Sequence, residues 1–146
     1  MKVHEIDGAD VFHFHPGTPM FHGVNTRGIM GKGVAAQVRA KAPEVYKEYR
    51  QACFSGLLVP GGLFVATTRA GTPVLNCASQ KDLGAVAKLE WVESSMTLAA
   101  QWCQTNGHAS MRGVAIGCGI GGLKWPDVRN ILENISADVD CYVCFL

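Results

Sequence analysis

The sequence has little charge of either sign and no long apolar segment. Only 17% of its 146 residues are charged, and 13 basic against 12 acidic side chains leave a formal net charge of +1. A balance this close to neutral argues against the broad positive surface that non-specific nucleic-acid binding requires. No run approaches about 18 consecutive apolar residues, so the sequence predicts no transmembrane helix and no membrane partner. With 48% apolar residues, the composition is that of a globular chain.

Several familiar sequence signals are missing. There is neither a GxxxxGK[ST] phosphate loop nor a GxSxG nucleophile motif. The first ten residues carry no apolar stretch of the signal-peptide type, and most of the six cysteines lie in apolar segments. We therefore expect free thiols and a reducing, cytoplasmic location. Cys141 and Cys144 fall in a predicted strand, whereas a redox CxxC usually opens a helix. His13 and His15 lack a third ligand, so neither a metal nor a cofactor is expected.

The apolar periodicity predicts one α/β domain over residues 1–146, which we expect to be a monomer. Strands are predicted at 2–6, 21–25, 62–68, 73–79, 112–117 and 139–146. Helices are predicted at 34–42, 43–54, 88–107 and 126–135. Strands that alternate with helices favour a largely buried sheet, and the turn at 69–72 predicts a hairpin between two of the strands.

Glycine is abundant, at 17 residues, and it clusters after two predicted strands. TRGIMGKG (26–33) and GCGIGGLKW (117–125) each follow a strand and precede a helix. Glycine allows the backbone to approach a ligand closely, and successive N–H groups beside a helix N-terminus bind anions. Two such loops at the carboxyl ends of strands predict a diphosphate pocket that needs no basic cluster. The alternative is that the glycines only permit tight turns and close packing.

The second glycine cluster also matches the GxGxxG dinucleotide pattern, at Gly117, Gly119 and Gly122. Only 24 residues follow Gly122, which leaves room for one helix and one strand. A doubly wound dinucleotide domain is therefore not predicted. Cys118 lies where a reactive thiol is possible, but no histidine or aspartate can be paired with it from the sequence, so we expect a packing role.

Two stretches, VNTRGIMGKGVAAQV (24–38) and IGCGIGGLKW (116–125), resemble the macrodomain family in their order and separation. The segment NCASQKDLGAVAKLEWVESS (76–95) is similar to the branch that holds DarG-type DNA ADP-ribosyl glycohydrolase antitoxins and the terminal ADP-ribose glycohydrolase. ADP-ribose-1″-phosphate phosphatases belong to the same neighbourhood. The resemblance covers nearly the whole chain. It implies a three-layer α/β/α sandwich around a mixed, mostly parallel sheet, which binds ADP-ribose or an ADP-ribosylated substrate.

The resemblance also implies roles for individual positions. Asp10 matches the aspartate that accepts a hydrogen bond from the adenine amino group, and the aromatic that packs on adenine corresponds to Cys144 or Phe145, depending on the gap. The matched residues around the distal ribose and the diphosphate are Asn25, Gly28, Met30, Gly31, Lys32, Gly33, Val34, Ala35, Gly117, Cys118, Gly119, Ile120, Gly121, Gly122 and Leu123. Arg27, Lys32 and Lys124 are expected to form a small basic rim, which would suit an ADP-ribosylated nucleic acid.

One departure from the branch bears on catalysis. The lysine that engages the released carbon in these enzymes corresponds, without a gap, to Gln80, and the lysine here is Lys81. Glutamine neither forms a Schiff base nor donates a proton at a useful pKa. Either a one-residue bulge brings Lys81 into place as the catalytic residue, or this chemistry is lost.

Two functions therefore stay open. One is hydrolysis of an ADP-ribosyl linkage, on nucleic acid or protein, or of ADP-ribose-1″-phosphate. The other is capture of ADP-ribose or a derived nucleotide without turnover, which Gln80 favours.

Overall fold

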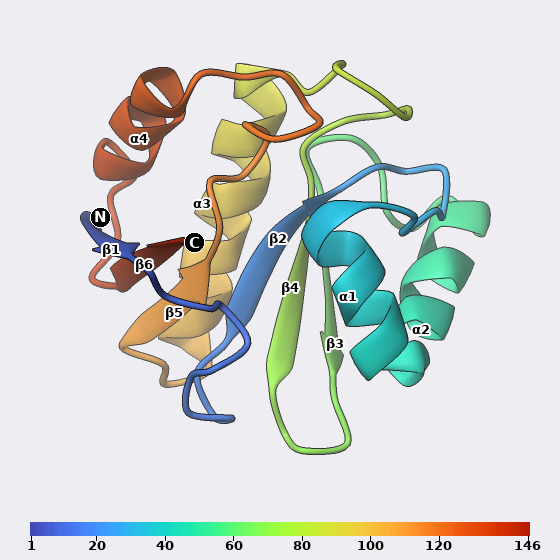
Figure 1. Ribbon diagram of the computed structural model, residues 1–146, viewed down its shortest axis with the longest axis horizontal. Helices are drawn as coiled ribbons and strands as arrows, with labels where there is room; N and C mark the ends of the chain where they lie inside the picture. Colours follow the sequence, from blue (N-terminus) through green and yellow to red (C-terminus); the bar gives the residue numbers. More distant parts are fainter.

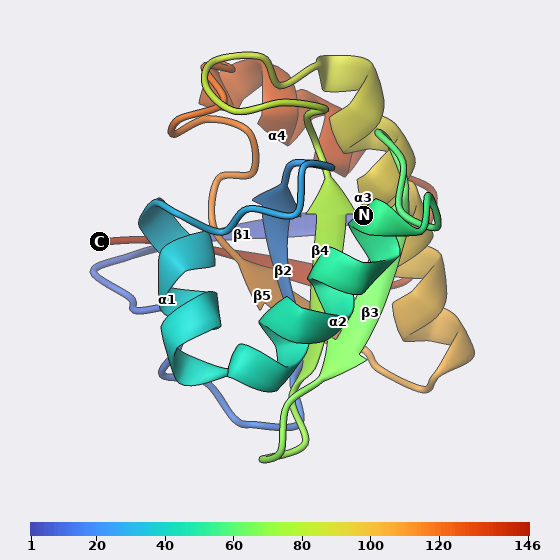
Figure 2. The same cartoon turned by 90° about the vertical axis from the view of Figure 1, so that its right-hand side faces the viewer.

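The computed structural model describes all residues, 1–146, as three layers (Figures 1 and 2). The middle layer is a six-stranded sheet in the order β1-β6-β5-β2-β4-β3, in which only the β3–β4 pair is antiparallel. Its strands are Lys2–Asp7 (β1), Met20–Val24 (β2), Leu63–Thr67 (β3), Pro73–Ala78 (β4), Ser110–Gly113 (β5) and Asp140–Phe145 (β6). The helices are Gly33–Lys41 (α1), Pro43–Phe54 (α2), Leu89–Thr105 (α3) and Trp125–Glu133 (α4). The predicted α/β/α sandwich is confirmed.

Each face of the sheet has its own apolar core. Helices α1 and α2 cover one face, and α3 and α4 cover the other (Figure 2). Successive side chains of a strand point to opposite faces, so Phe21 packs with the α3 and α4 core while Met20 and Val24 pack with the other. Because β2 is buried on both faces, its sequence is almost continuously apolar rather than alternating.

Each helix begins and ends within two residues of the predicted bounds. Helix α2 starts with Pro43 at its first position, where a missing N–H costs nothing. The proline also disfavours a helical conformation at Ala42, which has φ −138°, so α1 ends at Lys41. Helix α3 buries Val92, Met96, Ala99 and Cys103 at helical spacing. The predicted hairpin at 69–72 is confirmed by the antiparallel β3–β4 pair.

One predicted strand is displaced. The sequence predicts a strand at 112–117, whereas β5 spans Ser110–Gly113. Residues 114–117 leave the sheet because Cys118 N–H closes a turn onto Ala115 O (3.1 Å) and Gly117 adopts φ +75°. The apolar run in this segment therefore forms the wall of a cleft instead of extending the strand.

None of the four helices combines the length and hydrophobicity needed to cross a bilayer. All six cysteines are free thiols. Because β2, β4 and β5 run parallel, their carboxyl ends lie at one edge of the sheet. The loops that follow them, residues 25–32, 79–88 and 114–124, gather above that edge (Figure 1).

Candidate functional site

A cleft lies where these three loops meet. It consists of two adjoining cavities of about 420 and 280 Å³. The residues that line both cavities are Gly23, Lys32, Ala35, Gln80 and Ile120. The end of the chain, residues 144–146, lines the larger cavity, and the loop at 79–88 contributes Leu83 and Gly84 to the smaller one. Such a volume is typical of sites for nucleotide-sized ligands.

The first wall of the cleft is the N-terminus of α1. Lys32 provides no side-chain cap, and the first intrahelical bond runs from Ala36 N–H to Lys32 O (3.2 Å). The N–H groups of Gly33, Val34 and Ala35 have no acceptor within the protein, and these three residues line the larger cavity. Uncapped N–H groups at the positive end of a helix dipole are a ready site for an anion.

The second wall is the glycine loop after β5. Leu123 N–H donates to Gly117 O (2.9 Å), which closes the loop on itself. The N–H groups of Gly119, Ile120 and Gly121 have no acceptor within the protein, and all three residues line the larger cavity. The two walls therefore offer two sets of free N–H donors to a single ligand, as two anion-binding loops would.

The glycines of this loop differ in whether packing requires them. A Cβ on Gly121 would lie 2.7 Å from Gly117 O and 2.8 Å from the Cβ of Ala87, so close packing alone requires glycine at 121. A Cβ on Gly119 would meet nothing within 4 Å, and Gly119 has no positive φ. Packing and turn geometry do not explain Gly119, whereas the close approach of a ligand does.

No aspartate or glutamate side chain lines the cleft. Lys32 is its only formally charged side chain. His22 lies at the base of the larger cavity, where burial lowers its pKa to about 4 and leaves the ring neutral. Of the predicted basic rim, Arg27 is paired with Asp82 (2.9 Å) and Lys124 lies outside both cavities. These surroundings suit an anion, and they include no aspartate or glutamate that could act as a general acid or base.

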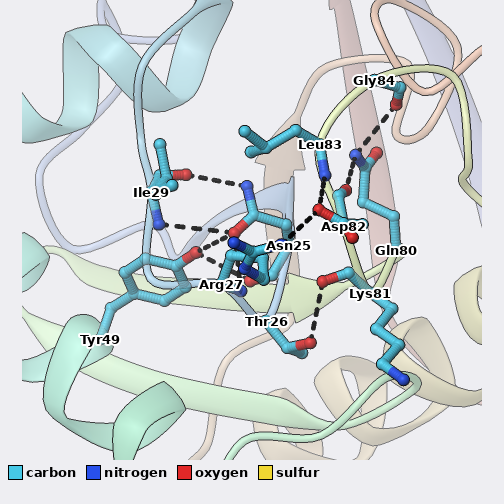
Figure 3. A network of polar contacts seen from close by, with 10 residues as sticks. All are labelled: Asn25, Thr26, Arg27, Ile29, Tyr49, Gln80, Lys81, Asp82, Leu83 and Gly84. Atoms are coloured by element: carbon cyan, nitrogen blue, oxygen red, sulfur yellow. Dashed lines mark hydrogen bonds and ion pairs between the residues drawn. The ribbon is translucent and has the colours of Figure 1, made fainter.

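Asn25 holds the loop at 25–32 in shape (Figure 3). Its Nδ2 donates to Ile29 O (2.9 Å), and its Oδ1 accepts from Arg27 N–H (3.0 Å). The Tyr49 hydroxyl from α2 lies 2.7 Å from the Asn25 carbonyl oxygen and 3.0 Å from Oδ1. Asn25 lines the smaller cavity, but its amide is used within the loop. No sequence pattern marked Tyr49, because it occupies an ordinary core position of its helix.

The side chains of Gln80 and Lys81, in the loop after β4, point in different directions (Figure 3). The Gln80 side chain lines both cavities, and its Nε2 donates to Asp82 O (2.6 Å) and Gly84 O (3.1 Å). The Lys81 side chain is exposed, extends away from Gln80 (Figure 3) and lines neither cavity. The Lys81 carbonyl accepts from the Thr26 N–H (3.2 Å) and hydroxyl (3.1 Å). This position of Lys81 outside both cavities gives no support to a catalytic role, which stays a prediction.

Asp10 lies beside the cleft rather than in its lining. Its Oδ1 accepts from Phe12 N–H (2.9 Å), and its Oδ2 has only His13 nearby, at 3.8 Å. The preceding Ala9 N–H donates to Phe145 O (3.2 Å), which fixes this segment at the end of β6. Phe145 lines the larger cavity and packs edge-on against Trp125. The predicted contact of Asp10 with adenine stays a prediction.

The predicted ligand residues divide into two groups. Those that line the cleft are Asn25, Gly31, Lys32, Gly33, Val34, Ala35, Gly117, Gly119, Ile120, Gly121 and Phe145. Those that shape its loops without lining it are Gly28, Met30, Cys118, Gly122 and Leu123. Met30 is buried in the core beneath the first loop. Burial raises the pKa of the Cys118 thiol, whose Sγ lies 3.5 Å from Ile116 O, so it is a packing residue.

Part of the lining of the smaller cavity was not predicted from the sequence. Ile29 and Leu83 join Ile120 around the smaller cavity, and each of these three aliphatic side chains is more than a third exposed. An aliphatic residue within a glycine-rich loop is the only signal that marked Ile29. Leu83 carried no signal, because its contact with the other two loops depends on the tertiary fold.

Comparisons with known proteins agree with this geometry. A family model described as the Macro domain matches residues 21–132. The DNA ADP-ribosyl glycohydrolase of Mycobacterium tuberculosis is 32% identical over 126 residues, which cover 82% of this chain and 36% of that protein. The DNA ADP-ribosyl glycohydrolase of Thermus aquaticus is 31% identical over 114 residues, covering 76% of this chain and 32% of that protein. The chain thus spans about a third of the length of these relatives.

A solved structure supports the same assignment. The macrodomain of M. tuberculosis DarG superimposes with a TM-score of 0.86 at 27% identity, over 98% of each chain. The family model covers most of the sequence, and both glycine loops that build the cleft fall within the matched residues. The chain therefore belongs to the macro domain family.

Proposed function

We propose that this protein binds the ADP-ribosyl group in the cleft and hydrolyses its linkage to DNA. The observation that carries the proposal is the pair of facing walls with free N–H groups and no acidic side chain between them. A diphosphate between the walls would accept hydrogen bonds from both, without a basic cluster. The relatives named as DNA ADP-ribosyl glycohydrolases support cleavage as the outcome of binding.

The two cavities suggest the orientation of the ligand. The larger cavity reaches the chain end at Phe145, beside Asp10, and would take the adenosine half. The smaller cavity, bounded by Asn25, Gln80 and Leu83, would take the distal ribose. The linkage to be broken would then lie at the outer end of the smaller cavity, next to Gln80.

The absence of an aspartate or glutamate from the cleft restricts the chemistry. Gln80 can orient a water or a ribose hydroxyl, but its amide has no pKa that would let it act as a general acid or base at neutral pH. We infer that water attacks the anomeric carbon while the bond to the acceptor breaks. A diphosphate oxygen of the substrate would take the proton of the attacking water, and solvent would protonate the departing group. The protein would contribute binding and orientation, whose effect on rate can be large.

A second candidate function is capture of ADP-ribose without turnover. Gln80 favours it, because this side chain occupies the place that the resemblance assigns to a lysine and is held by two carbonyl oxygens. In that case, the cleft would bind the same ligand with the same contacts and release it unchanged.

Hydrolysis of ADP-ribosylated thymidine in single-stranded DNA, followed by chromatography, separates the two candidates. ADP-ribose-1″-phosphate serves as the second substrate. We expect the wild-type protein to release ADP-ribose, Lys81→Ala to match it, and Gln80→Lys to be faster. Binding of ADP-ribose without release of product from either substrate would establish the capture function. A loss of turnover in Lys81→Ala would restore that lysine as the catalytic residue.

A further inference from the structure

A second cavity lies at the opposite edge of the sheet, away from the cleft. Its volume is about 420 Å³, and it shares no lining residue with the cleft. It is bounded by the loop between β1 and β2, the junction of α1 and α2, and the β3–β4 hairpin, which lies at the lower end of the sheet in Figure 1. Met20 and Val74, at the amino ends of β2 and β4, form part of its lining.

A buried cation lines this cavity. Arg112 on β5 is only 3% exposed, yet it forms no ion pair with any carboxylate. Its Nε donates to Val11 O (3.0 Å), and its Nη1 donates to the carbonyl oxygens of His15 and Thr18. Carbonyl oxygens and the face of the Phe14 ring, whose centroid lies 5.6 Å from Arg112 Cζ, thus surround a full positive charge without any carboxylate. A buried charge is costly unless an opposite charge accompanies it, so this side chain is suited to pair with an anion from outside.

Further cations stand at the mouth of the same cavity. Lys41, at the end of α1, and Arg69, in the hairpin, are both exposed and line it. Glu44 is its only acidic residue, and that carboxylate already accepts from Arg69 N–H (3.1 Å). Three cations against one carboxylate leave a formal charge of +2, with His13 taken as neutral. This local excess contrasts with a chain whose net charge is only +1.

We propose that the cavity around Arg112 binds the phosphate group of a small molecule. Arg112 would meet the phosphate at the base, and Lys41 and Arg69 would meet it at the mouth. Phe12, Met20 and Val38 add an apolar lining that would contact the rest of the molecule. The volume lies within the range of roughly 300–1,000 Å³ that is typical of small-molecule sites. The proposal does not depend on the function of the cleft, and both sites could be filled at once.

Titration with inorganic phosphate and pyrophosphate tests the proposal. The protein, residues 1–146, would first be saturated with ADP-ribose, because pyrophosphate should also bind the N–H walls of the proposed ADP-ribose cleft. Binding would be followed by calorimetry and by the Arg112 Nε–H signal in ¹H–¹⁵N NMR spectra. We expect saturable binding with a shift of that signal. The double variant Lys41→Gln with Arg69→Gln should bind at least about tenfold more weakly, since each lost contact is a charge-assisted hydrogen bond.

Lys47→Gln is the matched control, because Lys47 is an exposed cation of α2 that does not line the cavity. It should leave pyrophosphate binding unchanged, and all variants should bind ADP-ribose like the wild type. The proposal is overturned if the Arg112 signal does not move, or if the double variant binds as well as the control. If ADP-ribose fails to bind, the Arg112 signal still reports on this cavity, so failure of the cleft proposal is a separate result.

Discussion

The stability of the protein should fall steeply between pH 6.5 and pH 4 because of His22. This ring is fully buried, and its Nε2 lies 2.6 Å from Asn76 Oδ1. Asn76 Nδ2 donates to Phe64 O (3.1 Å), so Oδ1 is the acceptor and the histidine donates through Nε2. Its Nδ1 then carries no proton and has no partner. Protonation at Nδ1 would place a charge in the core, which is why burial lowers the pKa to about 4.

The size of the effect follows from the two pKa values. In the unfolded chain, His22 titrates near its ordinary value of 6.5, whereas in the folded chain it titrates near 4. Between these values, the unfolded state binds the extra proton, so the free energy of unfolding decreases as the pH falls. Each pKa unit is worth ~1.4 kcal/mol, so the total loss is about 3 kcal/mol. That is a large part of the roughly 5–15 kcal/mol by which a domain is stable.

Urea unfolding at half-unit steps from pH 7.5 to pH 4 measures this loss. His22→Gln keeps an N–H donor for Asn76 but does not titrate, so its free energy of unfolding should fall less steeply in the same window. His13→Gln removes a histidine with an 80% exposed side chain and should keep the wild-type slope. A His22→Gln protein whose stability falls as steeply as that of the wild type would refute the reasoning, whatever its stability at neutral pH.

Three further substitutions test the packing and the binding contacts. Gly113→Ala would place a Cβ 2.3–2.5 Å from ring atoms of Phe21, so the free energy of unfolding in urea should drop by about 1–3 kcal/mol. Tyr49→Phe removes the hydroxyl that holds Asn25, and we expect a loss of about 1–2 kcal/mol of stability, together with weaker ADP-ribose binding by calorimetry. Asp10→Ala should weaken ADP-ribose binding about tenfold without lowering the melting temperature, because it removes a charged acceptor that stabilises the protein little. Unchanged affinity in Asp10→Ala would show that adenine does not contact that carboxylate.

The sequence was most informative where structure depends on neighbouring residues. The two glycine loops were predicted as anion sites because turn formation, free N–H groups and a following helix are local properties. Helix α1 was predicted to stop before Pro43 for the same kind of reason. The end of β5 was misplaced because an apolar run looks alike whether it continues a strand or lines a cleft. Only the turn at Cys118 decides between these two outcomes.

Contacts between segments far apart in the chain could not be predicted from the sequence. The hydrogen bond from Arg112 to the Val11 carbonyl joins residues 101 positions apart, and Tyr49 on α2 reaches Asn25 in the loop after β2. No periodicity marks either pair. The sequence left open whether Gln80 or Lys81 faces the cleft. The path of the loop after β4, which Thr26 holds through the Lys81 carbonyl, places Gln80 there. Local sequence patterns therefore predicted where the cleft lies, whereas contacts between distant segments determine which side chains line it.

Calorimetric titration of ADP-ribose into the wild-type protein and Gly119→Val tests the central claim most directly. A Cβ at position 119 meets nothing within 4 Å, so the variant should keep the wild-type melting temperature. Its branched side chain should nevertheless displace a diphosphate from the N–H wall and weaken binding at least about tenfold. We predict one binding site in the wild type and this selective loss in the variant. Equal affinity in the two proteins, or no binding in the wild type, would contradict the assignment of the cleft.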